Sequence, residues 1–449
     1  MTTAPSAAPA TITAPVADRA LHPRLGWGWA AAFVIALALV LVLIYAIVEL
    51  FLFGVGLWGT NIPFVWGFDL INYAWWISIA NASSLIAVIL ALRRHGLRTA
   101  INRFAEAAAL FSVICAGLFP IIHLGRPELF YWVVPYPPTF EVWPQFRSPL
   151  IWDFWSITTH IIVTTLFWYV GLIPDLAHLR DRAPAGKAKV VYGLLALGWR
   201  GSERQWYNHQ LAYRILAALI VPLILVMQSV VAFEFAVTLV PDWHQMRFPF
   251  HFVVSALSSG LATVLLIAIA LRRALRLEMF ITDQNIDMMA KLLLAASVVL
   301  AYSYLDDAFT ALLGDPYGRA SFAARLSGQF APFYWGAVLF AVLLPQILWL
   351  ERVRVHSALL VGIAIGVNVG IWLDRFSVVI IGLYRDYLPS AWGHYQPTLA
   401  EWMLLIGTIG LFATMLLLFV RFVPVIVMFE TKEEHQKQAG FEPPRERAP

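Results

Sequence analysis

Long apolar runs constrain this 449-residue chain more than any other feature of its sequence. They recur along its whole length, and each is long enough to cross a hydrocarbon core about 30 Å thick. Charged residues make up 13% of the chain, whereas a soluble domain carries about 25%. The sequence therefore predicts an all-α polytopic membrane protein. It excludes a soluble enzyme, a secreted disulfide-linked module and a nucleic-acid-binding protein.

We predict ten membrane-spanning helices. The predicted spans are residues 27–52, 70–92, 104–123, 150–174, 211–239, 248–271, 290–313, 331–350, 357–382 and 398–422. The membrane domain is thus expected over residues 27–422, between a disordered tail (1–26) and a charged tail (423–449). The first span exceeds the roughly 7–15-residue apolar core of a signal peptide, so we expect it to remain as an anchor.

Lys and Arg residues are unevenly distributed between alternate loops. The loops and tails on one side of the predicted membrane carry 21 of them, and those on the other side carry 6. Because cytoplasmic loops are enriched in Lys and Arg, the charge-rich side is predicted to be cytoplasmic, and both termini lie on that side. The opposite side is predicted to be periplasmic, and its aromatic loops 53–69 and 124–149 are expected to pack against another subunit.

The single cysteine, Cys115, limits the redox chemistry of the chain. It can form no disulfide within the chain, and a cluster held by four thiolates cannot be built from it. We interpret Cys115 as a small buried residue of a membrane helix and predict no metal site. Any metal cluster that works with this protein is therefore expected on a partner.

Eight carboxylates lie within the predicted spans, where each costs at least about 2.5–3.5 kcal/mol. Glu106 lies near the cytoplasmic end, and Glu49 and Glu401 are interpreted as interfacial. The other acids are Asp153, Glu234, Asp306, Asp307 and Asp374, and basic or imidazole groups at similar depth are His123, Arg126, His251 and Arg375. The sequence therefore predicts an ionisable cluster just beneath the outer surface.

His123 and Asp153 are the most informative pair in this cluster. His123 ends the third span, and Asp153 opens the fourth span 30 residues later, so the two can face each other across an outer helix hairpin. A quinol releases phenolic protons as its electrons leave, and a carboxylate–imidazole pair can accept them near neutral pH. This pattern favours a quinol site, although a single intramembrane histidine is more often a structural hydrogen-bonding group.

The positions of several polar residues predict a line of polar side chains that runs inward from Asp153. Asp153, His160 and Thr164 are spaced by seven and four residues, so they share one face of the fourth helix. Asn81 on the second helix and Ser303 on the seventh could continue this line. The candidate proton path comprises His160, Thr164, Asn81, Ser303, Asp306, Asp307 and Asp374. The alternative interpretation is helix packing through small and hydroxyl residues.

Haem binding and secondary transport are two alternatives to quinol oxidation. A b-type haem needs two histidines at matching depth on facing helices, and only His123 and His251 come close. A secondary transporter commonly has broken helices and a site near the midplane, whereas the charges here cluster near one surface. Both functions are therefore disfavoured.

Several long motifs occur in an order typical of one family. They are GLWGTNIPFVWGFDLINYAWWI, HLGRPELFYWVVPYPP and DYLPSAWGHYQPTLAEW. Over roughly residues 45–425 the chain resembles the NrfD/polysulfide-reductase membrane subunit family. It is most similar to the related C and F subunits of bacterial alternative complex III.

This resemblance implies two four-helix bundles, spans 2–5 and spans 6–9, flanked by spans 1 and 10. It implies a location in the bacterial inner membrane, no cofactor in this chain, and menaquinol or ubiquinol as substrate at the periplasmic side of the first bundle. Electrons would pass to a partner iron–sulfur/molybdopterin-like subunit and then to multiheme cytochrome c subunits. A paralogous NrfD-like subunit would be a further partner.

The resemblance also assigns site residues. His123 in HLGRP, Asp153 in PLIWD and Glu234 in FEFA correspond to the quinol-binding residues of the family. Where this chain has FEFA, the family has FDFA, so Glu234 is a conservative replacement of an aspartate. Arg375 would be an accessory residue. Gln228 replaces a histidine that the family usually carries shortly before FDFA. The presence of His123, Asp153 and an acid at position 234 favours the role of the C subunit. The alternative is an F-like paralogue that is structural or conducts protons and binds no quinol.

Overall fold

The computed structural model describes residue 21 and residues 26–93, 96–133, 148–245, 247–385 and 388–428. Regular secondary structure within these ranges is helical throughout, and ten helices are long and apolar enough to cross a membrane. The all-α prediction with ten spans is therefore confirmed for the described residues. Most of the two predicted tails and part of loop 124–149 lie outside them.

The ten long elements follow the predicted spans closely. They are α3 (Trp27–Phe53), α4 (Phe68–Arg93), α5 (Gly96–Ile122), α6 (Pro149–Arg182), α8 (Glu203–Ala236), α9 (Phe248–Ala274), α10 (Asp283–Leu313), α12 (Ala331–Ala337) with η3 (Val338–Leu343) and η4 (Leu344–Trp349), α14 (Ser357–Phe376) with η5 (Ser377–Ile381) and α15 (Gly382–Tyr384), and α16 (Leu399–Phe422). Shorter helices are η1 (Val55–Leu57), η2 (Pro127–Val133), α7 (Lys187–Leu195), α11 (Pro316–Ser327), α13 (Glu351–Arg354) and η6 (Pro389–Ala391).

Several helices extend beyond their predicted spans, and α6 and α8 are two examples. α6 continues to Arg182, and α8 begins at Glu203, so much of the predicted loop 175–210 is helical. A capping box at Ser202 starts α8, with Gln205 as its reciprocal partner. The span prediction follows apolar residues only, whereas these extensions are polar, and the predicted spans are therefore too short here.

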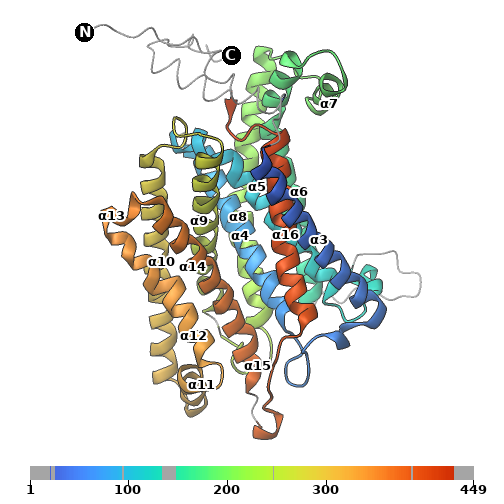
Figure 1. The fold of residues 1–449 in the computed structure, drawn as a ribbon. Coiled ribbons are helices and arrows are strands. Elements are labelled where there is room, and N and C mark those ends of the chain that lie inside the picture. Colours follow the sequence, from blue (N-terminus) through green and yellow to red (C-terminus); the bar gives the residue numbers. More distant parts are fainter. Residues whose placement is uncertain are drawn as a thin grey trace.

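The helices form two four-helix bundles (Figure 1). α4, α5, α6 and α8 make the first bundle, and α9, α10, α14 and the α12–η4 segment make the second. α4 and α9 form the largest contact between the bundles, and α16, which pairs with α3, packs against α4 and α5. The predicted arrangement of spans 2–5 and 6–9, flanked by spans 1 and 10, is confirmed.

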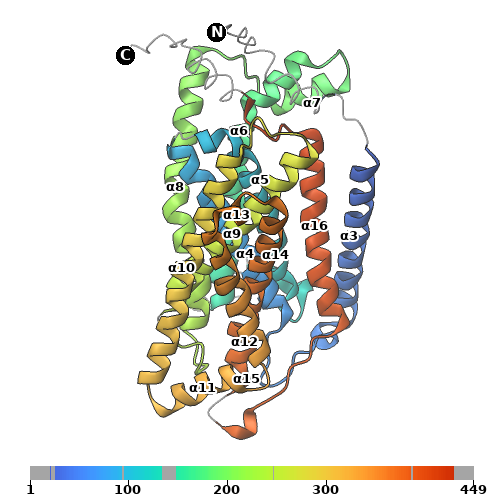
Figure 2. The ribbon, with the colours of Figure 1, turned by 60° about the vertical axis from the view of Figure 1, so that its left-hand side comes forward.

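The start of α3 and the end of α16 lie at the same end of the molecule. The indole of Trp29 donates to the Leu417 carbonyl (3.2 Å), and the Arg421 guanidinium lies 4.9 Å from the Trp29 ring. We call this the basic end, because it carries the Lys- and Arg-rich segments that join α6 to α8 and α9 to α10. The opposite end, where α5 ends and α6 begins, is called the far end (Figure 2). The sequence predicts that the far end is periplasmic.

Glu401, which the sequence suggests is interfacial, lies in the first turn of α16 and is a buried hydrogen-bonding group. Its side chain is fully buried and accepts hydrogen bonds from the backbone N–H groups of Gly59 (2.8 Å) and Thr398 (2.8 Å). The Tyr395 hydroxyl also donates to it, and burial raises the pKa of Tyr395 above its usual range, with the Glu401 charge adding to the effect. Glu401 therefore ties the α3–α4 connection to the start of α16.

Residues 53–69 find much of their packing surface within the chain. Phe64 is fully buried, and its ring contacts Phe330 (6.3 Å between centroids) and Tyr395 (5.7 Å). Phe53, Ile62 and Val65 remain exposed. That this loop packs against another subunit stays a prediction, and these three apolar side chains are the ones available for it.

Candidate functional site

Three helices of the first bundle bring ionisable groups together at the far end. Asp153 lies in the second turn of α6 and is 4% exposed. The Tyr73 hydroxyl on α4 donates to Asp153 Oδ1, and the carboxyl group of Glu234, near the end of α8, lies close to that of Asp153. Two buried carboxyl groups that lie close together repel each other when both are ionised, so one proton held between them is favoured. The pair is therefore suited to hold and pass on one proton.

His123 adds an imidazole to this cluster from directly after α5. Its ring packs edge-on against Trp66 (5.2 Å between centroids) and Tyr73 (6.3 Å). His123 is buried, and neither ring nitrogen has a hydrogen-bond partner among the described residues. Buried polar atoms are normally paired, so both nitrogens remain able to bond to a group that the described residues do not supply. Tyr73 thus lies between His123 and Asp153.

Local sequence explains why these side chains point to one place. Gly125 has φ +77°, a left-handed conformation that glycine adopts without steric cost, and it turns the chain immediately after His123. Pro149 occupies the first turn of α6 after Ser148, and this fixes where the helix begins. The HLGRP and PLIWD motifs therefore each contain a helix boundary and a site residue.

Polar residues are buried along the first bundle toward the basic end. Asn81 on α4 donates to Gln228 Oε1 (2.6 Å), and Gln228 donates to the Phe252 carbonyl (3.1 Å). His160 Nε2 lies 3.3 Å from Ser84 Oγ, and Thr164 is buried one turn further along α6. Three candidate path residues, His160, Thr164 and Asn81, thus lie inside this bundle. Gln228, where the resemblance leads us to expect a histidine, bonds to one of them, Asn81.

A second charged cluster, which sequence analysis does not identify, lies near the basic end of this bundle. Arg103 pairs with Asp175 (2.7 Å) and approaches Glu106 (3.8 Å), and all three side chains are almost fully buried. Asn102 and the Tyr213 hydroxyl donate to Glu106. Asp175 falls in a predicted loop because the fourth predicted span ends at residue 174. The i, i+3 spacing of Arg103 and Glu106 is the available signal.

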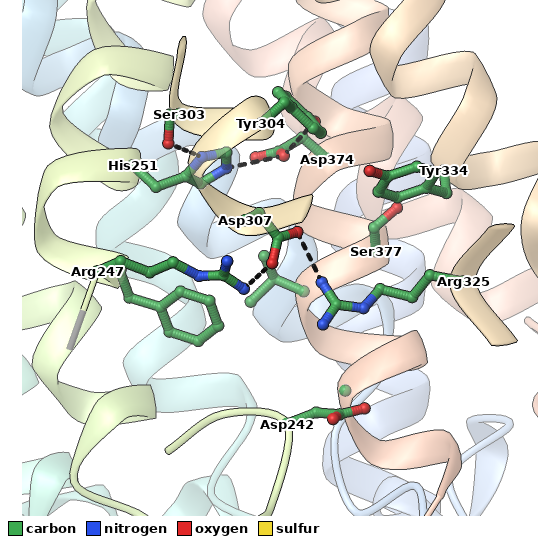
Figure 3. Close-up of a pocket in the computed structure, with 13 residues that line it drawn as sticks. Asp242, Arg247, His251, Ser303, Tyr304, Asp307, Arg325, Tyr334, Asp374 and Ser377 are labelled. Atoms are coloured by element: carbon green, nitrogen blue, oxygen red, sulfur yellow. Dashed lines mark hydrogen bonds and ion pairs between the residues drawn. The ribbon is translucent and has the colours of Figure 1, made fainter. Parts of the chain in front are cut away.

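The second bundle contains its own ionisable cluster around a cavity of about 50 Å³ (Figure 3). His251 Nδ1 lies 2.9 Å from Ser303 Oγ, and its Nε2 lies 3.0 Å from Asp374 Oδ1. Ser303 therefore does not continue the line that begins at Asp153, because α10 belongs to the other bundle. His251, the second histidine considered for a haem, engages both ring nitrogens here.

Two arginines flank Asp307 at this cavity. Arg325 of α11 donates to Asp307 Oδ2 (2.9 Å), and Arg247 pairs with the other carboxylate oxygen, as Figure 3 shows. Asp242 accepts hydrogen bonds from Ser321 (2.6 Å), and burial raises the pKa of Asp242. Asp306 is half-buried on the same helix as Asp307. Four candidate path residues, Ser303, Asp306, Asp307 and Asp374, thus lie on helices of the second bundle.

Arg375 is buried at the junction of the two bundles. Its guanidinium donates to Ser255 on α9 (2.6 Å), Ser78 on α4 (3.1 Å) and Asp374 (3.1 Å), and it stacks over the Phe252 ring at 3.9 Å. These contacts include none of the residues expected to bind quinol. The predicted accessory role of Arg375 therefore has no direct contact to support it, and the side chain joins the bundles instead.

Across the described residues, no group of three or more His, Cys, Asp or Glu side chains is arranged to hold a metal ion. Cys115 is buried and lies 3.5 Å from the Thr408 carbonyl.

Comparison with known proteins adds independent information. A sequence model of the family described as "Polysulphide reductase, NrfD" matches residues 56–385. The chain is 25% identical over 396 residues to the C subunit of a selenate reductase from Mesobacillus selenatarsenatis, covering 83% of this chain and 88% of the relative. It is 25% identical over 237 residues to a provisionally named C-type membrane subunit of dimethyl sulfoxide reductase from Halobacterium salinarum, covering 50% of each chain.

Proposed function

The chain belongs to the polysulphide reductase NrfD family, and from this premise we propose that it is the membrane subunit of a respiratory oxidoreductase that oxidises quinol at the far end of its first bundle. The two similar proteins are named as C subunits of reductases, which supports a subunit that works with catalytic partners. We propose iron–sulfur and molybdopterin-like partners on the periplasmic side. The far end then faces the periplasm of a bacterial inner membrane, and both termini are cytoplasmic.

The observation that carries this proposal is the meeting of four helices at one polar cluster. α4, the end of α5, α6 and α8 position Tyr73, His123, Asp153 and Glu234 in turn. Tyr73 contacts both His123 and Asp153, and the Glu234 carboxyl group lies close to that of Asp153. Oxidation of a quinol to a quinone releases two electrons and two protons. A free His123 nitrogen can accept one phenolic proton, and the Asp153–Glu234 pair, reached directly or through Tyr73, can accept the other.

The electrons require an acceptor outside this chain. We propose an iron–sulfur cluster of the partner subunit, placed against the far end so that electrons leave while the protons pass to the residues named above. Splitting electrons and protons in this way is what a quinol site between a bilayer and a partner must do. The Trp66 ring, which packs on His123, supplies an apolar and aromatic surface for a quinol ring.

At a finer level, we propose the role of the C subunit of an alternative complex III, with multiheme cytochrome c subunits and a paralogous NrfD-like subunit as further partners. His123, Asp153 and an acid at position 234 support this assignment. The second candidate is an F-like paralogue that binds no quinol. One observation favours it: Gln228 replaces the usual histidine and is held by Asn81 within the bundle.

We also propose proton movement through buried polar groups. In the first bundle, His160, Thr164 and Asn81 lie between the quinol cluster and the Arg103 cluster of the basic end. In the second bundle, Ser303, Asp306, Asp307 and Asp374 would act through the cavity at the far end. The two groups are separate, so any transfer between them must pass the junction at Arg375.

Labelling with a photoreactive quinone tests the quinol site. We expect the purified complex to be labelled in the peptides that contain His123 and Asp153, and we expect native quinol to compete for this labelling. Peptides around His251 in the second bundle serve as the internal control. If native quinol does not compete with the labelling of this chain, the result would favour the F-like role and contradict the proposal.

A further inference from the structure

The short helix α7 presents an apolar face that no described element covers. Val190, Val191 and Leu194 follow one face of the helix, and their side chains are 50–72% exposed. Leu197, in the turn that follows, is 67% exposed. Single exposed apolar residues need no explanation, but a contiguous group marks a surface that binds something.

The opposite side of α7 is fixed to the body of the protein. Ala196 is fully buried against Leu172 and Leu176 of α6, and the Tyr169 hydroxyl donates to the Leu195 carbonyl (2.7 Å). Arg180 donates to the Trp199 carbonyl (2.8 Å), which holds the segment after the helix. The direction of the exposed face is therefore set by the fold.

The position of α7 along the membrane normal follows from its contact with the end of α16. The Tyr192 hydroxyl donates to the carbonyl of Phe422, the last residue of the 24-residue helix α16 (3.2 Å). A helix of that length is about 36 Å long, slightly more than the roughly 30 Å hydrocarbon core. Figures 1 and 2 show α7 at the basic end, beyond the end of α16. α7 therefore lies where hydrocarbon gives way to lipid headgroups.

The charged residues around α7 indicate which kind of surface covers its apolar face. Residues 183–204 carry four basic residues and one acidic residue, Glu203. The basic residues are Lys187, Lys189, Arg200 and Arg204, and all four are exposed and form no ion pair with a described residue. Apolar side chains beside unpaired cations at interfacial depth match a leaflet that contains anionic lipid.

We propose that α7 is an interfacial helix that inserts its apolar face into the lipid leaflet at the basic end, while Lys187 and Lys189 bind the phosphate groups of anionic phospholipids. This contact would brace the polar extensions of α6 and α8, which project beyond the membrane. The inference rests on the position and chemistry of α7 alone, and it does not depend on quinol oxidation.

Fluorescence quenching in nanodiscs tests the insertion. A Cys115→Ala background accepts a fluorophore at Leu194→Cys on the apolar face or at Ala185→Cys near the tip of the α6 extension. With a quencher attached to the upper acyl chain, we expect quenching at position 194 to be several-fold stronger than at position 185. Equal, weak quenching at both positions would place α7 in water and overturn the proposal in favour of a protein surface.

Charge reversal tests the preference for anionic lipid. Energy transfer from position 194 to labelled phosphatidylglycerol, diluted in phosphatidylcholine, reports local enrichment. We expect Lys187→Glu with Lys189→Glu to lower the apparent affinity about fivefold per lysine or more. The matched control is Arg273→Glu with Arg276→Glu, which changes the charge of the same end away from α7. Equal losses in the two pairs would refute headgroup binding at α7.

Discussion

Replacing Asp153 by Asn is expected to lower quinol oxidation by about 100-fold or more, because the substitution removes the group that accepts a phenolic proton. The amide is nearly isosteric and can still accept the hydrogen bond from Tyr73, so the bundle should assemble. His123→Ala should have an effect of similar size. The measurement is steady-state electron transfer from quinol to the acceptor of the purified complex, with subunit content determined in parallel.

Glu49→Gln provides the control for this experiment. Glu49 is a half-buried carboxylate just before the last turn of α3, at the same end of the protein, and it accepts a hydrogen bond from the Tyr45 hydroxyl rather than from a residue of the site. Its activity should stay within about twofold of the native complex, since surface substitutions have small effects. Full activity in an assembled Asp153→Asn complex would refute the assignment of Asp153.

Replacing Arg375 by Leu is expected to destabilise the protein by about 3–5 kcal/mol, because a buried charge on Asp374 would lose its cationic partner. The substitution also removes the hydrogen bonds to Ser78 and Ser255, which connect α4 to α9 and α14. Unfolding of the protein in detergent, followed by helical circular dichroism, gives the measurement. Arg319→Leu on the exposed side of α11 is the control and should change stability by less than about 0.5 kcal/mol.

A double variant separates the two roles considered for Arg375. If the charge pair is the main interaction, Asp374→Asn combined with Arg375→Leu should cost less than the sum of the single substitutions. An unchanged stability of Arg375→Leu, together with a raised KM for quinol, would contradict the junction role. It would restore the accessory role at the quinol site that the family resemblance implies.

The spans are predictable because apolar length is a strong and local signal. The ends of α6 and α8 are not, since their polar extensions leave the hydrocarbon and follow helix capping instead. Glu401 shows that an acid near a helix end can also be a buried structural group. Its Thr398 capping box is visible in the sequence, but its contact with Gly59 joins residues far apart in the chain.

The site is predictable only in part. His123 and Asp153 stand in motifs whose spacing suggests a hairpin, and Glu234 comes from the family pattern. Tyr73, which contacts both His123 and Asp153, lies within the motif GLWGTNIPFVWGFDLINYAWWI, but the motif alone does not single it out among the 15 tyrosines of the chain. The division of the candidate proton path between two bundles depends on which helices are neighbours. Helix pairing of this kind is set by packing between distant segments.

The most direct test is an experimental density map of the assembled complex with a quinone analogue bound. The account predicts the headgroup at the far end of the first bundle, with one oxygen within hydrogen-bond distance of a His123 ring nitrogen and the other near Asp153 or Tyr73. A headgroup found in the cavity beside His251 instead, with His123 and Asp153 sealed from it, would contradict the account.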